Sequence, residues 1–280
     1  MEYIKLNNGV EIPQLGYGVF QTPPDETERC VREAFEVGYR HIDTAQAYNN
    51  EEGVGAAIAG AGIDRQELFV TTKMWIYKEG YKAAKAAIDE SLKKLQSEYI
   101  DLMLIHQPFG DYYASYRAME EAYKDGKIRA IGVSNFYPDR LLDIAHFADV
   151  VPAVNQVETH VFFQQQEARA TMDELGVVQE SWGPFAEGRR DFFTNPTLTR
   201  VGEQYGKSAA QVGLRYLMQR GVVVIPKSTH RNRMEDNFNI FDFELSPVDM
   251  EQILALDEHK SLFLDHSDPQ SVKGFLNRAR

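Results

Sequence analysis

Residues 100–106 read Ile-Asp-Leu-Met-Leu-Ile-His, a short and nearly continuous apolar run that ends on a histidine. Its length suits a β-strand, and its lack of polar alternation indicates a strand buried on both faces, as in a parallel sheet covered by helices. Two other runs have the same form: residues 39–42 end beside Asp43, and residues 68–72 end beside Lys73. Each predicted strand therefore carries an ionisable side chain at its carboxyl end.

Short β-like runs and helical patterns alternate along the rest of the chain. Between the runs, apolar residues recur at three- and four-residue spacing, as at Ala83, Ala87, Ile88 and Leu92. Eight such alternations fit a closed (β/α)8 TIM barrel, a fold of about 250 residues, better than an open sheet. The predicted strands are residues 14–18, 39–42, 68–72, 100–105, 130–133, 154–157, 177–181 and 222–225.

The two ends of the chain are expected to add to this barrel. An Asn-Gly turn at residues 7–9 between two β-like runs predicts a hairpin, which we expect to cap the barrel bottom. Residues 183–196 read as a long loop and residues 261–280 as an irregular tail near the barrel mouth. Since a barrel of this size forms one domain, residues 1–280 are predicted to be a single domain.

Composition excludes several classes of partner. The formal net charge is −12 and no basic stripe is visible, so nucleic acid is not expected to bind. Cys30 is the only cysteine, which rules out an intramolecular disulfide and suits a reducing compartment. The N-terminus does not resemble a secretory signal, and no apolar run approaches the ~20 residues that span a membrane. These features predict a cytoplasmic protein without membrane contact.

Four titratable side chains are predicted to share one pocket, because the carboxyl ends of the strands surround the active site in this type of barrel. Asp43, Lys73 and His106 stand at strand ends, and Tyr48 follows in the loop after Asp43. A phenol has a pKa near 10, and a neighbouring ammonium lowers it. Asp43 can keep Lys73 charged, and a neutral His106 can donate to a carbonyl oxygen. Such a group can protonate an oxygen while hydride reaches the carbon, and a cofactor must supply that hydride.

Other interpretations of these residues remain open at this point. Taken singly, Asp43 can be a turn residue, Lys73 a solvated amine, His106 a hydrogen-bonding turn residue and Tyr48 a packing aromatic. Lys73 at a strand end can also form a Schiff base, as in a lyase or aldolase. A third possibility is a barrel that binds the cofactor without catalysing a reaction.

Several long motifs in the right order resemble the aldo-keto reductase family. They are residues 38–45 (GYRHIDTA), 48–51 (YNNE), 131–136 (IGVSNF) and 225–228 (IPKS). Residues 52–55 and 180–184 are most similar to bacterial members of the 2,5-diketo-D-gluconate reductase type. The resemblance runs from the hairpin to about residue 243 and is more specific than a lone glycine-rich match.

This resemblance implies a reductase of aldehydes or ketones that depends on NADPH, with NADH as a weaker alternative. It also implies that the protein is a monomer. Tyr48 would be the general acid, assisted by Lys73, Asp43 and His106. No metal is implied. The residues implied to bind the cofactor are Ser134, Asn135 and Gln156 at the nicotinamide carboxamide, Trp182 as its stacking partner, Lys227, Ser228 and Arg233 at the 2′-phosphate, and Asp236 and Asn237 at adenine.

The substrate wall departs from the family pattern. Where many relatives have tryptophan after the strand-end histidine, this chain has Gln107, which predicts a less apolar wall and more polar substrates. Phe20, Trp75 and Phe109 are the other predicted wall residues. Sugar-derived diketo acids and 2-oxoaldehydes are the candidate substrates. His160 is expected to order its own loop, and His266 in the tail can lie near the mouth.

Overall fold

Eight parallel strands form the centre of the molecule in the computed structural model, which describes residues 1–76 and 80–278. The strands are hydrogen-bonded in the order β10-β9-β8-β7-β6-β5-β4-β3. The sheet closes because Val224 N–H donates to Gln14 O at 2.9 Å and Gly16 N–H donates to Val224 O at 2.8 Å. The strands are β3 (Tyr17–Gly18), β4 (His41–Asp43), β5 (Phe69–Met74), β6 (Ile100–Ile105), β7 (Ile128–Ser134), β8 (Val154–Glu158), β9 (Val178–Trp182) and β10 (Val223–Val224).

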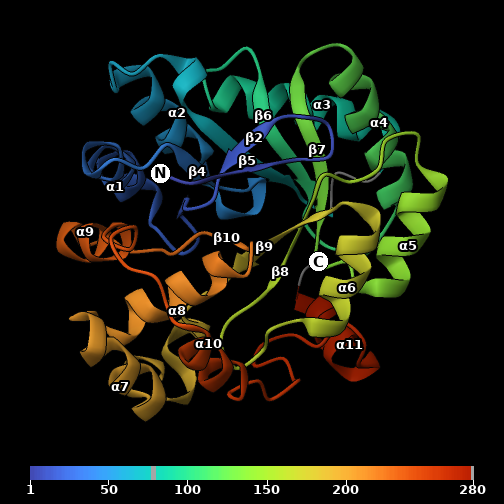
Figure 1. The fold of residues 1–280 in the computed structure, drawn as a ribbon. Coiled ribbons are helices and arrows are strands. Elements are labelled where there is room, and N and C mark those ends of the chain that lie inside the picture. Colours follow the sequence, from blue (N-terminus) through green and yellow to red (C-terminus); the bar gives the residue numbers. More distant parts are fainter. Residues whose placement is uncertain (77–79, 279–280) are drawn as a thin grey trace.

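The predicted (β/α)8 barrel is therefore confirmed, with all eight strands at their predicted places. The first and last strands are shorter than expected, because residues 14–16 reach β10 through the closing bonds and only Tyr17–Gly18 pairs regularly with β4. Helices surround the strands (Figure 1). They are α1 (Pro24–Val37), α2 (Glu51–Gly60), α3 (Tyr81–Lys94), α4 (Tyr112–Lys124), α5 (Pro138–Phe147), α6 (Gln166–Leu175), α7 (Pro196–Tyr205), α8 (Ala209–Gln219), α9 (Arg231–Phe238), α10 (Pro247–Leu254) and α11 (Pro269–Arg278).

Strand β6 shows why an apolar run without alternation suits this fold. Leu102 and Leu104 belong to a small core cluster that also contains Ile12 of the hairpin. Met103 and Ile105 belong to the larger cluster shared with the helices. Successive side chains point to opposite faces of a strand, so one face fills the barrel and the other packs under helices. Both faces are mainly apolar because both are buried, and the exception, Asp101, is paired with Arg65 and Arg129.

The N-terminal hairpin caps the bottom of the barrel, as predicted. Strand β1 (Tyr3–Lys5) pairs antiparallel with β2 (Glu11–Pro13), and the hairpin crosses the strands in Figure 1. The Asn7 side chain donates to Pro152 O at 3.0 Å, and that of Asn8 donates to Arg129 O at 2.9 Å. These acceptors lie where β8 and β7 begin, which is the end opposite the predicted active site.

The C-terminal tail is not irregular throughout, and this prediction was wrong. Helix α11 begins at Pro269, and Asp268 accepts from the backbone N–H of Ser271 at 2.9 Å and from its hydroxyl at 2.7 Å. An acceptor at the N-cap followed by proline is a common way to start a helix. The long loop at residues 183–196 was predicted correctly as a loop, and it contains short 3₁₀ turns, η3 (Ala186–Thr194), like η1 (Gln46–Tyr48) and η2 (Arg65–Glu67) elsewhere.

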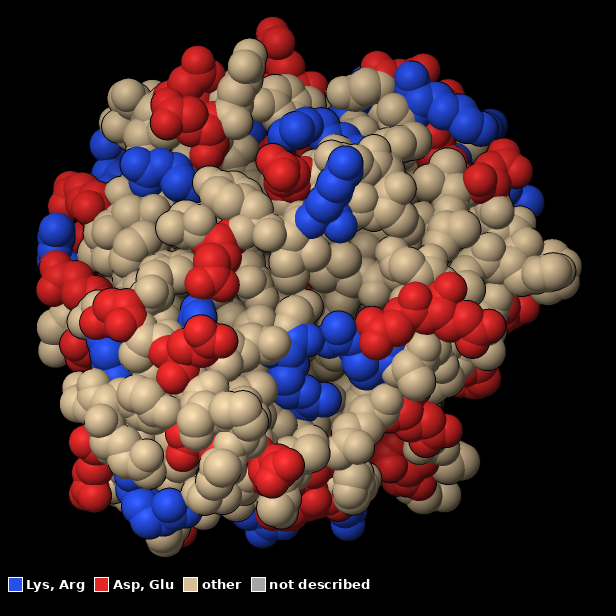
Figure 2. Space-filling view, in the orientation of Figure 1, with Lys and Arg blue, Asp and Glu red and all other residues tan. Residues whose placement is uncertain are grey.

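The surface carries both signs of charge. Acidic and basic side chains are interspersed over the face shown in Figure 2. Within residues 1–76 and 80–278, no helix has the length and apolar character needed to cross a bilayer. The same part of the chain holds no group of three or more His, Cys, Asp or Glu side chains arranged to bind a metal ion.

Candidate active site

The inward faces of neighbouring strands bring the predicted catalytic residues together. Phe69 on β5 and Leu104 on β6 belong to the cluster inside the barrel. Because side chains alternate along a strand, Lys73 lies on the same inward face as Phe69, and His106 continues the face of Leu104. On β4, Ile42 packs outward under the helices, which leaves the neighbouring Asp43 facing inward. The three strand ends therefore aim at one point above the barrel core.

Lys73 connects the acid to the phenol. Its Nζ lies 2.5 Å from Asp43 Oδ1, 3.0 Å from Thr44 O and 3.3 Å from Tyr48 Oη. Tyr48 stands at the end of the short turn η1, and the next residue, Asn49, adopts a left-handed conformation with φ of 56°. Lys73 is fully buried and Asp43 is 2% exposed. The ammonium thus has acceptors on three sides and is held in a fixed place.

Burial decides the protonation of the phenol. Burial raises the pKa of Tyr48, and the Lys73 ammonium only partly offsets that rise. The expectation that Lys73 would bring the pKa of Tyr48 below its ordinary value was therefore wrong in its net direction. Burial alone would lower the pKa of Lys73, but Asp43 and Tyr48 raise it on balance, so the amine stays charged. The site holds a protonated phenol beside a permanent cation.

His106 is neutral and lies beside Tyr48. Its ring centroid is 5.6 Å from that of Tyr48 and 5.0 Å from that of Trp75. Burial, followed by the charge of Lys73, lowers the pKa of His106 well below its ordinary value. A neutral imidazole next to a protonated phenol gives two possible donors for one oxygen atom.

The residues predicted to bind nicotinamide form a connected network under this group. Gln156 Nε2 donates to Asp43 Oδ2 at 2.8 Å, and Ser134 Oγ donates to Gln156 O at 2.8 Å. Asn135 Nδ2 donates to His106 O at 3.1 Å, and Trp182 Nε1 donates to Asn135 Oδ1 at 2.8 Å. All four predicted residues thus lie together and contact the predicted catalytic residues directly or through one another.

Glu180 is a buried residue that sequence reasoning missed. It accepts from Gln156 Nε2 at 3.1 Å, and it is fully buried. Burial, and then the nearby Asp43 carboxylate, raises the pKa of Glu180 to about 8. The signal was available, because Glu180 precedes Trp182 by two residues on β9 and so shares its inward face.

The residues predicted to hold the adenosine end line one cavity of about 430 Å³. This volume is within the usual range for ligand sites. Lys227 and Arg233 are both exposed there, and neither forms an ion pair with another residue in the described part of the chain. The lining residues are the five predicted ones, Lys227, Ser228, Arg233, Asp236 and Asn237, together with Phe185, Phe193, Ser208, Ala210, Thr229 and His230.

Aromatic rings from the barrel and from the tail meet at the substrate end. The Phe20 ring lies 5.0 Å from Tyr48, and the side chain is 48% exposed. The ring centroid of Phe275 on α11 lies 6.1 Å from that of Trp75 and 5.7 Å from that of Phe109. The predicted wall residues therefore surround the mouth. Phe275 was missed because nothing near it in the sequence indicates which ring it will meet.

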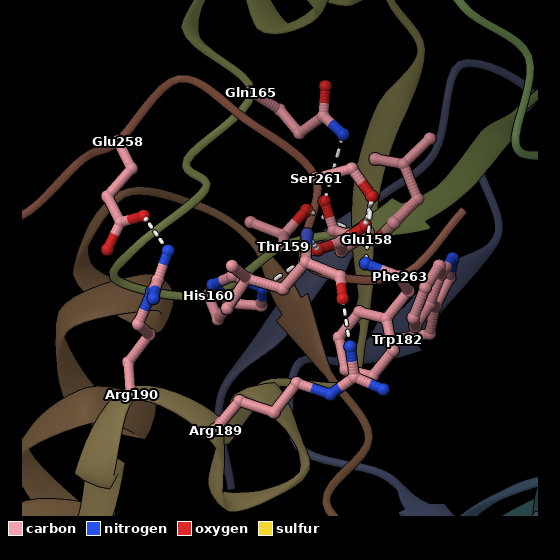
Figure 3. A network of polar contacts seen from close by, with 12 residues as sticks. Glu158, Thr159, His160, Gln165, Trp182, Arg189, Arg190, Glu258, Ser261 and Phe263 are labelled. Carbon is pink, nitrogen blue, oxygen red and sulfur yellow. Dashed lines mark hydrogen bonds and ion pairs between the residues drawn. The ribbon is translucent and has the colours of Figure 1, made fainter. Parts of the chain in front are cut away.

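Glu158 holds the start of the tail on the barrel (Figure 3). Its carboxylate accepts from Ser261 Oγ at 2.6 Å and from Leu262 N–H at 2.8 Å. His160 Nε2 lies 3.0 Å from the same carboxylate, so this histidine orders the end of β8, as expected. Glu158 is only 3% exposed. We call Glu158, His160, Ser261 and Leu262 the tail anchor.

The tail anchor places Phe263 against Trp182. The two ring centroids are 5.3 Å apart in an edge-on arrangement, and the Arg189 guanidinium lies 4.1 Å from the centre of the Phe263 ring. Arg189 also donates to Leu262 O, and Arg190 pairs with Glu258 at 2.8 Å. Figure 3 shows Arg189 reaching from η3 towards Phe263. The η3 loop and the tail are thus joined beside the predicted nicotinamide platform.

Comparison with known proteins identifies the family. A model of the aldo/keto reductase family matches residues 14–258. The chain belongs to the aldo/keto reductase family. Glyoxal reductase of Bacillus subtilis is 47% identical to this aldo/keto reductase over 257 residues, which cover 91% of this chain and 92% of the relative. Methylglyoxal reductase DkgA of Escherichia coli is 41% identical over 262 residues, covering 92% and 94%.

Solved structures support the same family and fold. The aldo-keto reductase of Bombyx mori, solved in complex with NADP, has a TM-score of 0.89 and 36% identity, and the match covers 96% of each chain. A deep-sea metagenome aldo-keto reductase has a TM-score of 0.92 and 39% identity, covering 95% of this chain and 99% of the other. The chain is thus an oxidoreductase of a family that uses NADP(H).

The residues of this aldo/keto reductase fit NADP(H). The two exposed cations of the adenosine cavity carry no competing ion pair within residues 1–76 and 80–278, so they are free to bind a phosphate. Ser228 lies between them in the sequence, and its backbone oxygen is held by the Tyr17 hydroxyl. At the other end, the amides of Asn135 and Gln156 provide polar groups for a carboxamide.

Proposed function

We propose that this aldo/keto reductase reduces aldehydes and ketones to alcohols with NADPH and that Tyr48 is the general acid. The observation that carries the proposal is the position of Lys73, whose ammonium lies between Asp43 Oδ1 at 2.5 Å and Tyr48 Oη at 3.3 Å. A proton leaving the phenol creates an anion next to a fixed cation, and such prepared charge stabilises the transition state.

Each residue has a separate task in this mechanism. When bound, NADPH supplies the hydride that reaches the carbonyl carbon. Tyr48 Oη gives its proton to the carbonyl oxygen as negative charge develops there, and Lys73 stabilises the resulting phenolate. Asp43 keeps Lys73 charged and in place. The neutral His106 donates a hydrogen bond that orients the carbonyl oxygen. Burial raises the pKa of Tyr48, so the phenol holds its proton at neutral pH, and the Lys73 ammonium opposes that rise by stabilising the phenolate formed on transfer.

The cofactor would lie between two groups of residues. Ser134, Asn135, Gln156 and Trp182 would hold the nicotinamide end, with the indole as the stacking surface. Lys227, Ser228, Arg233, Asp236 and Asn237 would hold the adenosine end.

We expect a preference for NADPH over NADH, because only the former carries the phosphate that Lys227 and Arg233 can bind. Arg233→Ala should raise the KM for NADPH by about tenfold, the effect of losing one hydrogen bond to a charged group, and leave the KM for NADH unchanged. Steady-state kinetics with both cofactors measures this difference. Equal changes in both KM values would contradict the phosphate assignment.

Short 2-oxoaldehydes are the favoured substrates, with sugar-derived diketo acids as a second group. Two relatives at 47% and 41% identity bear the names glyoxal reductase and methylglyoxal reductase, which supports the first group. The amide of Gln107 in an otherwise aromatic wall supports polar substrates in general.

Two other functions are less well supported. A Schiff-base lyase needs a neutral lysine, whereas Asp43 and Tyr48 raise the pKa of Lys73 against the effect of burial. A non-catalytic NADPH-binding protein has no need for the short Lys73–Asp43 contact beside a phenol.

A direct assay separates the three functions. The purified protein is mixed with NADPH and methylglyoxal, and NADPH absorbance and the alcohol product are followed together. We expect one alcohol formed for each NADPH consumed. Quenching of tryptophan fluorescence by NADPH without consumption would favour the binding protein, and trapping of a substrate on Lys73 by borohydride would favour the lyase.

A further inference from the structure

Gln107 and His266 form a polar pair in an aromatic part of the mouth. His266 Nε2 lies 2.9 Å from Gln107 Oε1, although the residues are 159 positions apart. Gln107 is 8% exposed and directly follows His106. The tail therefore places the imidazole of His266 next to Gln107. Gln107 is the wall position at which many members of the family have tryptophan.

The pair lies at the same mouth as the catalytic histidine. Phe109 stacks against His266, with ring centroids 5.8 Å apart and an angle of 17° between the planes. Three further ring pairs continue from Phe109. The ring centroids are 5.7 Å apart for Phe109 and Phe275, 6.1 Å for Phe275 and Trp75, and 5.0 Å for Trp75 and His106. This chain of rings joins the polar pair to the site where the carbonyl oxygen is bound.

The amide of Gln107 keeps an unused donor whichever way the pair shares its proton. Burial lowers the pKa of His266 to about 4, so the ring is neutral near pH 7 and carries one N–H. If that N–H donates to Gln107 Oε1, both amide N–H groups remain. If the amide is turned and donates to the ring, one N–H remains. Within residues 1–76 and 80–278, the Gln107 side chain makes no other hydrogen bond.

A free donor among aromatic rings discriminates between substrates. A polar group that is removed from water without a partner is unfavourable, so a substrate that fills it is favoured over one that leaves it empty. An N–H requires an acceptor, which means an oxygen on the substrate. The hydrogen bond with His266 fixes the orientation of the Gln107 amide. The remaining N–H of the amide is therefore oriented before the substrate enters.

We propose that Gln107, held by His266, is a specificity-determining residue that donates a hydrogen bond to a second oxygen close to the reacting carbonyl. The preferred substrates are then short 2-oxoaldehydes and 2-hydroxyaldehydes, and plain aldehydes of the same length are poorer. This inference rests on the proposed function, because it concerns the carbonyl that Tyr48 protonates. It assigns to the tail a direct part in substrate selection, through His266.

The test compares matched substrates in matched variants. Methylglyoxal and glyceraldehyde carry the second oxygen, and propanal and butanal lack it. Gln107→Leu removes the amide at nearly constant size, and His266→Phe keeps the ring on Phe109 but removes the contact with Gln107. Because each variant is compared with the wild type on the same substrate, differences in aldehyde hydration cancel.

We expect Gln107→Leu to lower kcat/KM for methylglyoxal and glyceraldehyde by about 10- to 100-fold, the range for one hydrogen bond within a buried site, and to leave propanal and butanal within about threefold. His266→Phe should act in the same direction with a smaller loss. Equal losses on all four substrates, or no loss, would overturn the specificity role while leaving the proposed function intact. If the wild type consumes NADPH with none of them, the proposed function fails and the specificity role fails with it.

Discussion

The proposed catalytic group and the proposed substrate wall lie next to each other but are built in different ways. Asp43 and Lys73 project from adjacent strands whose backbones are fixed by the sheet, and their contact is 2.5 Å long and almost fully buried. The wall is completed by His266 and Phe275, which reach the mouth only because the tail folds back over the barrel. Changes in the first region should therefore alter the chemistry, and changes in the second should alter which substrate is accepted.

Loss of the central cation should have the largest effect. Lys73→Met should lower kcat by about 10²- to 10⁴-fold, because the phenolate loses its stabilising charge. It should also lower the free energy of unfolding by about 3–5 kcal/mol, because Asp43 is left buried without its partner. Turnover kinetics and denaturant unfolding measure the two effects.

The double variant Asp43→Asn/Lys73→Met provides the control for this prediction. It removes both charges, so we expect much of the stability to return while activity stays low. A Lys73→Met protein that is as stable and as active as the wild type would show that the strand-end region does not depend on its ion pair.

The two regions should also differ in how their stability responds to pH. The pKa of Glu180 is raised from 4.5 to about 8, so the folded protein retains a proton that the unfolded chain has lost across this range. Stability contributed at Glu180 therefore falls as pH rises from about 4.5 to 8, by up to about 1.4 kcal/mol per pH unit. Glu180→Gln should remove this slope in unfolding experiments, and an unchanged slope would contradict the buried, protonated carboxyl.

His266 in the wall should show the opposite dependence. Its pKa is lowered from 6.5 to about 4 by burial, so the unfolded chain binds a proton first as pH falls. Stability at His266 is therefore lost as pH drops from about 6.5 to 4, and His266→Phe should reduce that loss. Measuring the free energy of unfolding against pH for both variants therefore compares Glu180 in the barrel interior with His266 at the mouth.

The smallest expected effect concerns the tail anchor. Glu158→Gln keeps the size of the side chain but removes the charge that Ser261 and Leu262 bind. We expect the KM for the carbonyl substrate to rise by up to about tenfold, the equivalent of one hydrogen bond to a charged group, with little change in kcat. Limited proteolysis should cut the tail faster in this variant.

Glu258→Gln is the matched control, because it breaks the exposed pair with Arg190 in the same segment. Exposed pairs contribute about 0–1 kcal/mol, so kinetics and proteolysis should stay near those of the wild type. If the two variants behave alike, the buried carboxylate of Glu158 is not what holds the tail.

The barrel and its strand-end residues were predictable from sequence because they follow from local patterns. A doubly buried strand such as residues 100–105 is apolar except for Asp101, and the residue after it continues an inward face. Glu180 lies on such a face and could have been found in the same way. Helix α11 also had a signal, since Asp268 and Pro269 form a typical helix start.

The substrate wall and the protonation states were not predictable in this way. The contact between Gln107 and His266 joins residues 159 positions apart, and its formation depends on how the tail packs in three dimensions. The pKa of Tyr48 depends on whether burial or the Lys73 charge has the greater effect. Both effects were foreseeable, but their balance depends on distances and on exclusion of water that the sequence does not contain.

The central claim is that Tyr48 protonates the substrate, and a single-turnover experiment with Tyr48→Phe tests it most directly. The variant is loaded with NADPH and mixed with methylglyoxal, and the loss of NADPH absorbance is followed. We predict that hydride transfer slows by at least about 100-fold, the usual contribution of a general acid, while NADPH quenches tryptophan fluorescence as in the wild type. Hydride transfer within about threefold of the wild-type rate, with the same cofactor binding, would contradict the assignment of Tyr48 as the acid.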